Sequence, residues 1–165
     1  AKLYGCTVIA TASPEKLDQL KELGADYAVD HRKEDWHKEV FKISKELAKK
    51  NKEAPGIDVI FEHIGGSHFN KELTLLKYGA TIVTTGATTG YDAPADLRHI
   101  FFKGINILGS TQGTRAELED GFYWMGQGKI KVIIDSEYTF ENAVDAHNKM
   151  LNGKGLVGKI ILKPE

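Results

Sequence analysis

The stretch GIDVIFEHIGG, residues 56–66, predicts the strand around which the fold is organised. Its apolar side chains form a run that is too short for a helix and rich in β-branched residues, so we expect a buried strand. The strand ends in Gly65 and Gly66, which leave the backbone bare directly before a helix that Ser67 is expected to cap. In open α/β sheets ligands lie beyond the carboxyl ends of the strands, and such a turn lets a flat or phosphorylated ligand approach closely. A tight turn without a ligand is the alternative.

Segments of strand and helix character alternate on both sides of this stretch. Strands are expected at residues 6–12, 27–29, 80–85 and 105–110, and helices at residues 14–23, 35–52, 67–78, 96–102 and 115–125. The last part adds a strand at residues 130–134, a helix capped by Thr139 with Phe140, Val144 and Leu151 facing inward, and a strand at residues 157–162. Such alternation requires parallel pairing and crossover helices. The predicted fold class is therefore α/β, with a doubly wound parallel sheet.

The composition is that of an ordinary soluble globular protein, and 165 residues suffice for one domain with a core. With 22 basic and 23 acidic side chains the net charge is -1, which argues against binding to nucleic acid or to an anionic membrane. The single cysteine, Cys6, excludes an internal disulfide framework and fits a reducing, cytoplasmic location. No apolar run reaches the roughly 18 residues that span a bilayer.

The turn ATASPEK, residues 10–16, bears on cofactor choice. An NAD-selective dinucleotide site places an acid at this strand end to bind the ribose 2′-hydroxyl, and none is present, which permits NADP. Lys16 near the start of the helix opposes the helix dipole at a cost of roughly 0.3 to 1 kcal/mol. A phosphate held between Ser13, the helix N-terminus and Lys16 would offset that cost. A solvated lysine on an exposed turn is the alternative.

Other chemistry has weak support in the sequence. The six histidines have no paired cysteines and no metal-binding spacing, so no metal site is expected, and His147 is expected to be packed on an apolar helix face. Cys6 begins an expected buried strand, and no serine lies in a G-x-S-x-G motif. Glu62 and His63 could act as acid and base, but a structural or ligand-contacting role is favoured, so no catalytic residue is assigned.

The phosphate-binding motif G-x-G-x-x-G is not present in the sequence. The opening AKLYG has the pattern of the last turn of a helix that Gly5 ends, and there is no initiator methionine. We therefore expect a first strand and its glycine-rich loop to precede Ala1.

Five segments in order resemble the C-terminal, cofactor-binding half of the medium-chain dehydrogenase/reductase family, particularly zinc-type alcohol dehydrogenases and quinone oxidoreductases: AKLYGCTVIATASPEKLDQLKELGAD, GIDVIFEHIGG, TIVTTGATTG, DLRHIFFKGINILGST and YTFENAVDAHNKMLNGKGLVGKIILKP. The resemblance implies that residues 1–128 are an incomplete NAD(P)-binding Rossmann domain without its first strand and glycine-rich loop. It implies that residues 129–165 form a segment that packs back on an absent catalytic domain, to which any catalytic zinc would belong.

The resemblance also implies a set of cofactor-binding residues: Ser13, Lys16, His31, Ile64, Gly65, Gly86, Ala87, Thr88, Leu108, Gly109 and Ser110. Among these, Ser13 and Lys16 match the contacts to a 2′-phosphate, and His31 matches a ring that lines the adenosine pocket. The others match three strand ends along which the adenosine and nicotinamide halves lie. The implied reaction is hydride transfer between a nicotinamide cofactor, NADP(H) favoured over NAD(H), and an alcohol, carbonyl or activated C=C.

The strand at residues 105–110 resembles the edge at which two copies of the family's sheets join, so we expect a homodimer. The parent would act on a small-molecule substrate, and the fragment alone is expected to be inactive. A non-catalytic nucleotide-binding or dimerisation module is the alternative. A methyltransferase-like domain is less favoured, because it would need an acid after its second strand.

Overall fold

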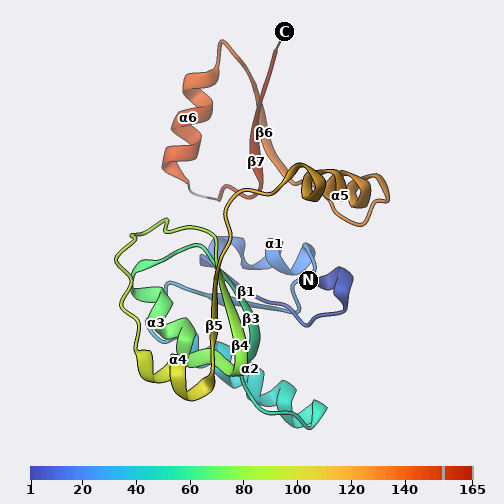
Figure 1. Ribbon diagram of the computed structural model, residues 1–165. Helices are drawn as coiled ribbons and strands as arrows, with labels where there is room; N and C mark the ends of the chain where they lie inside the picture. The colour runs from blue at the N-terminus through green and yellow to red at the C-terminus, as the bar shows by residue number, and fades with distance from the viewer. Residues whose placement is uncertain (154, 165) are drawn as a thin grey trace. The chain divides into compact units, whose positions relative to one another are not determined.

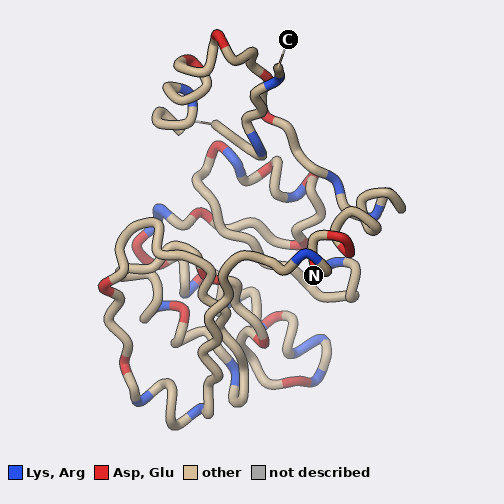
Figure 2. Tube along the Cα trace, turned by 45° about the horizontal axis from the view of Figure 1, so that its top comes forward, with Lys and Arg blue, Asp and Glu red and all other residues tan. Residues whose placement is uncertain are grey.

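The computed structural model describes residues 1–153 and 155–164 of the chain. The chain divides into two compact units, Ala1–Asp30 with Gly113–Glu165, and His31–Gln112. All strand pairs among the described residues are parallel, and in chain order a helix separates the two strands of every pair (Figure 1). The predicted α/β fold class with crossover helices is therefore confirmed. Figure 2 shows acidic and basic residues interspersed along the trace, as the near-zero net charge implies.

The unit His31–Gln112 is built on a three-stranded parallel sheet in the order β3-β4-β5. Its elements in chain order are α2 (Trp36–Asn51), β3 (Ile57–Glu62), α3 (Gly66–Leu75), β4 (Leu76–Thr84), α4 (Leu97–Lys103) and β5 (Asn106–Gly109). Helices α3 and α4 pack on the sheet around a core of buried side chains, namely Leu73, Leu76, Ala80, Ile82 and Ile105. Because Phe61, Val83 and Leu108 are in register across the three strands, the carboxyl ends of these strands lie along one edge.

The other unit contains two parallel pairs of strands. Its elements are the 3-10 turn η1 (Lys2–Tyr4), β1 (Ile9–Ala12), the 3-10 turn η2 (Pro14–Lys16), α1 (Leu17–Glu22), β2 (Tyr27–Asp30), α5 (Arg115–Gly126), β6 (Ile134–Thr139), α6 (Ala143–Asn152) and β7 (Lys159–Lys163). Strand β1 pairs with β2, and β6 pairs with β7. The carboxylate of Asp26 accepts hydrogen bonds from Lys2 Nζ and from the Val8 N–H, which joins η1 to the first pair.

Two strand predictions are corrected. The strand expected at residues 130–134 is wrong, because β6 runs over Ile134–Thr139, where it pairs with β7. The strand in residues 56–66 is present as β3, but it is not buried on both faces. Val59 and Phe61 are 50% and 72% exposed, whereas Glu62 is buried, because α3 covers one face only among the described residues.

Both predicted ends of the helix after the glycine turn are also wrong. Helix α3 has Gly65, not Ser67, as its N-cap, and it stops at Leu75. The chain continues directly into β4, so Gly79 lies within a strand rather than ending a helix. The ammonium group of Lys103 explains this end, because it donates to the carbonyl oxygens of Leu73, Thr74 and Leu76 at 3.4, 2.9 and 2.9 Å.

Three expectations of burial fail in the other unit. Cys6 is exposed and precedes β1, because its N–H bonds back to the Ala1 carbonyl in the turn after η1. Helix α6 turns Ala146 toward its strands, so Phe140, Val144 and Leu151, which were expected to face inward, are exposed. His147 is also exposed on this helix. Asn142, not Thr139, is the N-cap of α6.

Candidate functional site

Two loops at the carboxyl ends of β3 and β4 are joined by matching hydrogen bonds. The carbonyl of His63 accepts from the N–H and the hydroxyl of Thr88, at 3.1 and 2.8 Å. The carbonyl of Ile64 accepts from the N–H and the hydroxyl of Thr89, at 2.8 and 2.9 Å. Each threonine thus fixes one residue of the neighbouring turn with both its backbone and its side chain, which makes the two loops one rigid surface.

The glycine turn between β3 and α3 requires its glycines. Gly65 and Gly66 have φ angles of +74° and +53°, which side-chain-bearing residues rarely adopt. A Cβ atom at Gly65 would overlap the carbonyl oxygen of Gly90. The same oxygen accepts the N–H of Gly66 at 3.0 Å. The turn can therefore approach the loop after β4 only because residue 65 lacks a side chain.

A buried carboxylate lies under this turn. Glu62 is 1% exposed and accepts the N–H groups of Ile64 and Gly65, each at 2.5 Å, and the hydroxyl of Thr84 at 3.1 Å. These bonds give Glu62 a structural role. Because the turn's N–H groups are already bonded within the chain, and a negative charge lies beneath them, the turn suits a flat uncharged group better than a phosphate.

The third strand end adjoins the second. Leu108 and Gly109 pair with Val83 and Thr84, and the Ser110 N–H donates to the Thr84 carbonyl at 3.0 Å. The structure thus brings together eight of the predicted residues along one edge of the β3-β4-β5 sheet: Ile64, Gly65, Gly86, Ala87, Thr88, Leu108, Gly109 and Ser110. Six of these, from the loops after β4 and at the end of β5, are exposed.

His31 lies beside α3, next to the rings of His68 and Trp36, which sequence reasoning did not assign to the site. The ring centroid of His31 is 6.2 Å from that of His68, edge to face, and His68 stacks on Trp36 at 5.5 Å. Burial, followed by the charges of His31 and Lys71, lowers the pKa of His68, which favours its neutral ring. No spacing signal in the sequence indicated that His68 stacks on Trp36.

Ser13 and Lys16 belong to the other unit, Ala1–Asp30 with Gly113–Glu165. Ser13 follows β1 and is 7% exposed, but its side chain does not form the predicted capping hydrogen bond. Lys16 ends the turn η2 and is the N-cap residue of α1, so its charge lies at a helix N-terminus as expected. The unfavourable interaction of Lys16 with the helix dipole remains a prediction.

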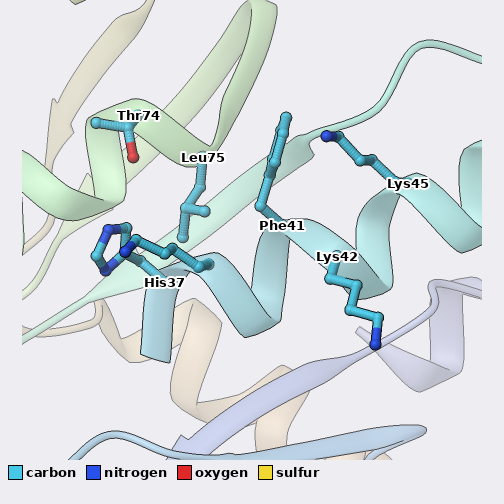
Figure 3. Close-up of a pocket in the computed structure, with 7 residues that line it drawn as sticks. His37, Phe41, Lys42, Lys45, Thr74 and Leu75 are labelled. Carbon is cyan, nitrogen blue, oxygen red and sulfur yellow. The ribbon is translucent and has the colours of Figure 1, made fainter. Parts of the chain in front are cut away.

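A groove between α2 and α3 lies outside the predicted site (Figure 3). It has a volume of about 420 Å³ and is lined by His37, Lys38, Phe41, Lys42, Lys45, Thr74 and Leu75. Lys45 Nζ lies 4.9 Å from the centre of the Phe41 ring. Thr74 and Leu75 are the last residues of α3, whereas the glycine turn precedes its first, so this groove is separate from the strand-end edge.

Within residues 1–153 and 155–164, no group of three or more histidine, cysteine, aspartate or glutamate side chains is placed to hold a metal ion. In the same residues, no helix combines the length and apolar character needed to cross a membrane.

Comparisons with known proteins give a consistent result. A sequence profile described as zinc-binding dehydrogenase matches residues 1–127. The quinone oxidoreductase of Pongo abelii is 31% identical over 98% of this chain and 48% of its own length. The crotonyl-CoA reductase of Streptomyces collinus is 29% identical over 96% of this chain and 38% of its own. A crystal structure of an NAD-dependent alcohol dehydrogenase superposes with a TM-score of 0.86 at 31% identity, over 99% of this chain and 45% of that one. The chain thus spans less than half the length of these relatives.

Proposed function

Because the chain belongs to the zinc-binding dehydrogenase family, we propose that it is the cofactor-binding portion of an oxidoreductase. The resemblance to the medium-chain dehydrogenase/reductase family is confirmed by the profile, the relatives and the solved structure. The proposed reaction is hydride transfer between a nicotinamide dinucleotide and an alcohol, a carbonyl or an activated C=C. The observation that carries the proposal is the rigid edge at which eight predicted residues converge, six of them exposed.

The proposed contacts to a nicotinamide dinucleotide are of two kinds, small or backbone groups for its flat parts and polar side chains for its phosphate. The glycine turn and the loops after β4 and β5 present backbone and small side chains to the flat groups of the ligand. Ser13 and Lys16 are proposed to bind a 2′-phosphate, and His31 to line the adenosine pocket. A bound nicotinamide supplies the hydride donor or acceptor, and the residues of this edge orient it and hold it against the sheet.

The domain division is proposed on the same basis. Residues 1–128 form the cofactor-binding domain, and residues 129–165 are a segment that packs against a separate catalytic domain. The exposed apolar side chains of the segment support this proposal, since Val144 and Leu151 are 69% and 81% exposed. Substrate acid/base groups and any zinc ligands would come from that catalytic domain.

The preference for NADP(H) is testable at Lys16. In calorimetric titrations of the full-length protein, Lys16→Ala is expected to weaken NADPH binding about tenfold, or about 1.4 kcal/mol, and to leave NADH binding unchanged. The reason is that only NADPH carries the 2′-phosphate. Lys21→Ala is the matched control, because Lys21 lies on the same helix, is exposed, and forms no ion pair in the described residues. Equal losses for both cofactors in Lys16→Ala would contradict the assignment.

A further inference from the structure

The groove between α2 and α3 combines an apolar middle with a cation at one end. His37, Phe41 and Lys45 are spaced four residues apart on α2, so they form one row along the helix with the Phe41 ring at its centre. Lys45 Nζ lies 4.9 Å from the centre of that ring, and Figure 3 shows this amino group directed toward Phe41. Leu75, the last residue of α3, is 3% exposed and lines the groove from that helix.

A second cation lies at the opposite end of the row. Lys38 follows His37 in the sequence and is seven residues before Lys45, which is two helical turns or about 10 Å along α2. A hollow of about 510 Å³ adjoins the groove at this end, since it shares His37 and Lys38 with the groove, and Lys71 of α3 lines it as well. The groove therefore has basic side chains at both ends of its apolar middle.

The cations of the groove are not neutralised by acidic partners. Among the described residues, no acidic side chain lines the groove, and neither of its two end lysines forms an ion pair. Glu34 and Asp35 line the adjoining hollow. Burial and then the charges of Lys71 and Lys38 nevertheless lower the pKa of His37, against the smaller opposing effect of Asp35. The surroundings of His37 thus favour a bound anion.

Lys38 also lies where its own helix does not favour it. It is the third residue of α2, and a positive charge in the first turn interacts unfavourably with the helix dipole. Lys49 and Lys50 lie in the last turn of the same helix, where a positive charge is favourable. The position of Lys38 is therefore not explained by helix stability, and an anionic ligand would explain it.

We propose that this groove binds an elongated organic dianion, a small molecule with an anionic group at each end of a flat apolar body. One anionic group binds at Lys38 and the other at Lys45, while the body lies against Phe41 and Leu75. The volume of about 420 Å³ is in the range of small-molecule sites. Because the groove is separate from the strand-end edge, this inference does not depend on the proposed function.

The first test is calorimetric titration of the full-length protein with 4,4′-biphenyldicarboxylate, which carries a carboxylate at each end of an aromatic body. The comparison ligand, 4-biphenylcarboxylate, carries one carboxylate and is expected to bind about fivefold more weakly to the wild type. Lys45→Gln should bind both ligands with equal affinity, because the second carboxylate then has no partner. Lys49→Gln, an exposed position of α2 outside the groove, removes the same charge and should keep the wild-type preference.

The second test follows the ring signals of His37 by NMR. A carboxylate bound at Lys38 should shift these signals and raise the pKa of His37 toward its ordinary value, because a nearby negative charge favours the protonated ring. Lys38→Gln should weaken the dicarboxylate about fivefold without lowering the urea midpoint, because its charge does not stabilise α2.

Three results would overturn the proposal: equal affinities of the two ligands for the wild type, the same loss in Lys49→Gln as in Lys45→Gln, or unchanged His37 signals at saturation. Repeating the titration with saturating NADPH should leave the dicarboxylate affinity unchanged. Displacement by NADPH would place the dicarboxylate at the strand-end edge and would also overturn the proposal. If NADPH itself does not bind, the proposed function fails, and the ligand and variant comparisons still decide whether the groove is a site.

Discussion

Gly65 is the residue at which the backbone of the candidate site is most tightly constrained. A Cβ atom there would overlap the Gly90 oxygen, whereas one at Gly79, which has a similar φ of +70°, would meet no heavy atom within 4 Å. Gly79→Ala should therefore cost about 1 kcal/mol for the left-handed conformation alone, and Gly65→Ala about 2 to 4 kcal/mol. Urea unfolding of both variants measures the difference. Equal losses would show that the contact with Gly90 is not tight in solution.

At the scale of single residues, the sequence predicts some features of the candidate site and not others. The sequence predicts a turn at Gly65 and Gly66 and a strand end at the loop GATTG, because glycines between apolar runs typically mark turns. The position of Glu62 at a strand end favours a structural role, but no spacing rule predicts that its carboxylate bonds back to Ile64 and Gly65. The stacking of His68 on Trp36 depends on how α3 packs against α2, and is therefore not readable from local pattern.

Among the elements, α3 is ended by a side chain from another helix. Lys103 of α4 donates to two carbonyl groups in the last turn of α3 and to the carbonyl of the residue that follows α3. Burial lowers the pKa of this lysine. Lys103→Met should keep most of the packing but leave these carbonyls unbonded, and cost about 1 to 3 kcal/mol. The expected result is a lower urea midpoint and faster amide exchange in α3. Lys42→Met, at an exposed position of α2, is the control, and equal effects of the two variants would contradict this role of Lys103.

The elements that the sequence predicts well are those with local signals. Helix α4 begins where expected, and the Asp96 side chain accepts the Arg98 N–H as its cap. Strand β6 was misplaced because its register is set by β7, far along the chain. Strand β7 can begin directly after Gly158 because this glycine has no side chain, since a Cβ atom there would overlap the Ile133 oxygen. Only the folded pair shows that contact, so the apolar run at residues 130–134 was a misleading signal.

For the whole molecule, the order of elements was predictable and the grouping of strands was not. Strand β1 has a ladder only with β2, and β3 only with β4, among the described residues. Local propensity predicts single strands, whereas their grouping into ladders depends on pairing between segments that are distant in the chain.

The proposed homodimer is a prediction about the whole molecule that β5 makes testable. All four of its residues are exposed, Ile107 and Leu108 by 43% and 53%, and in the described residues β5 pairs on one side only, with β4. An apolar strand with an unpaired edge is prone to associate with a second copy, and a lysine on such an edge opposes pairing. Sedimentation of the wild type should therefore give two chains, and Ile107→Lys should shift it to one. Leu118→Lys on α5, at a position that is 58% exposed, should remain dimeric. A wild type that sediments as a single chain, or an Ile107→Lys variant that stays dimeric, would exclude this edge as the interface.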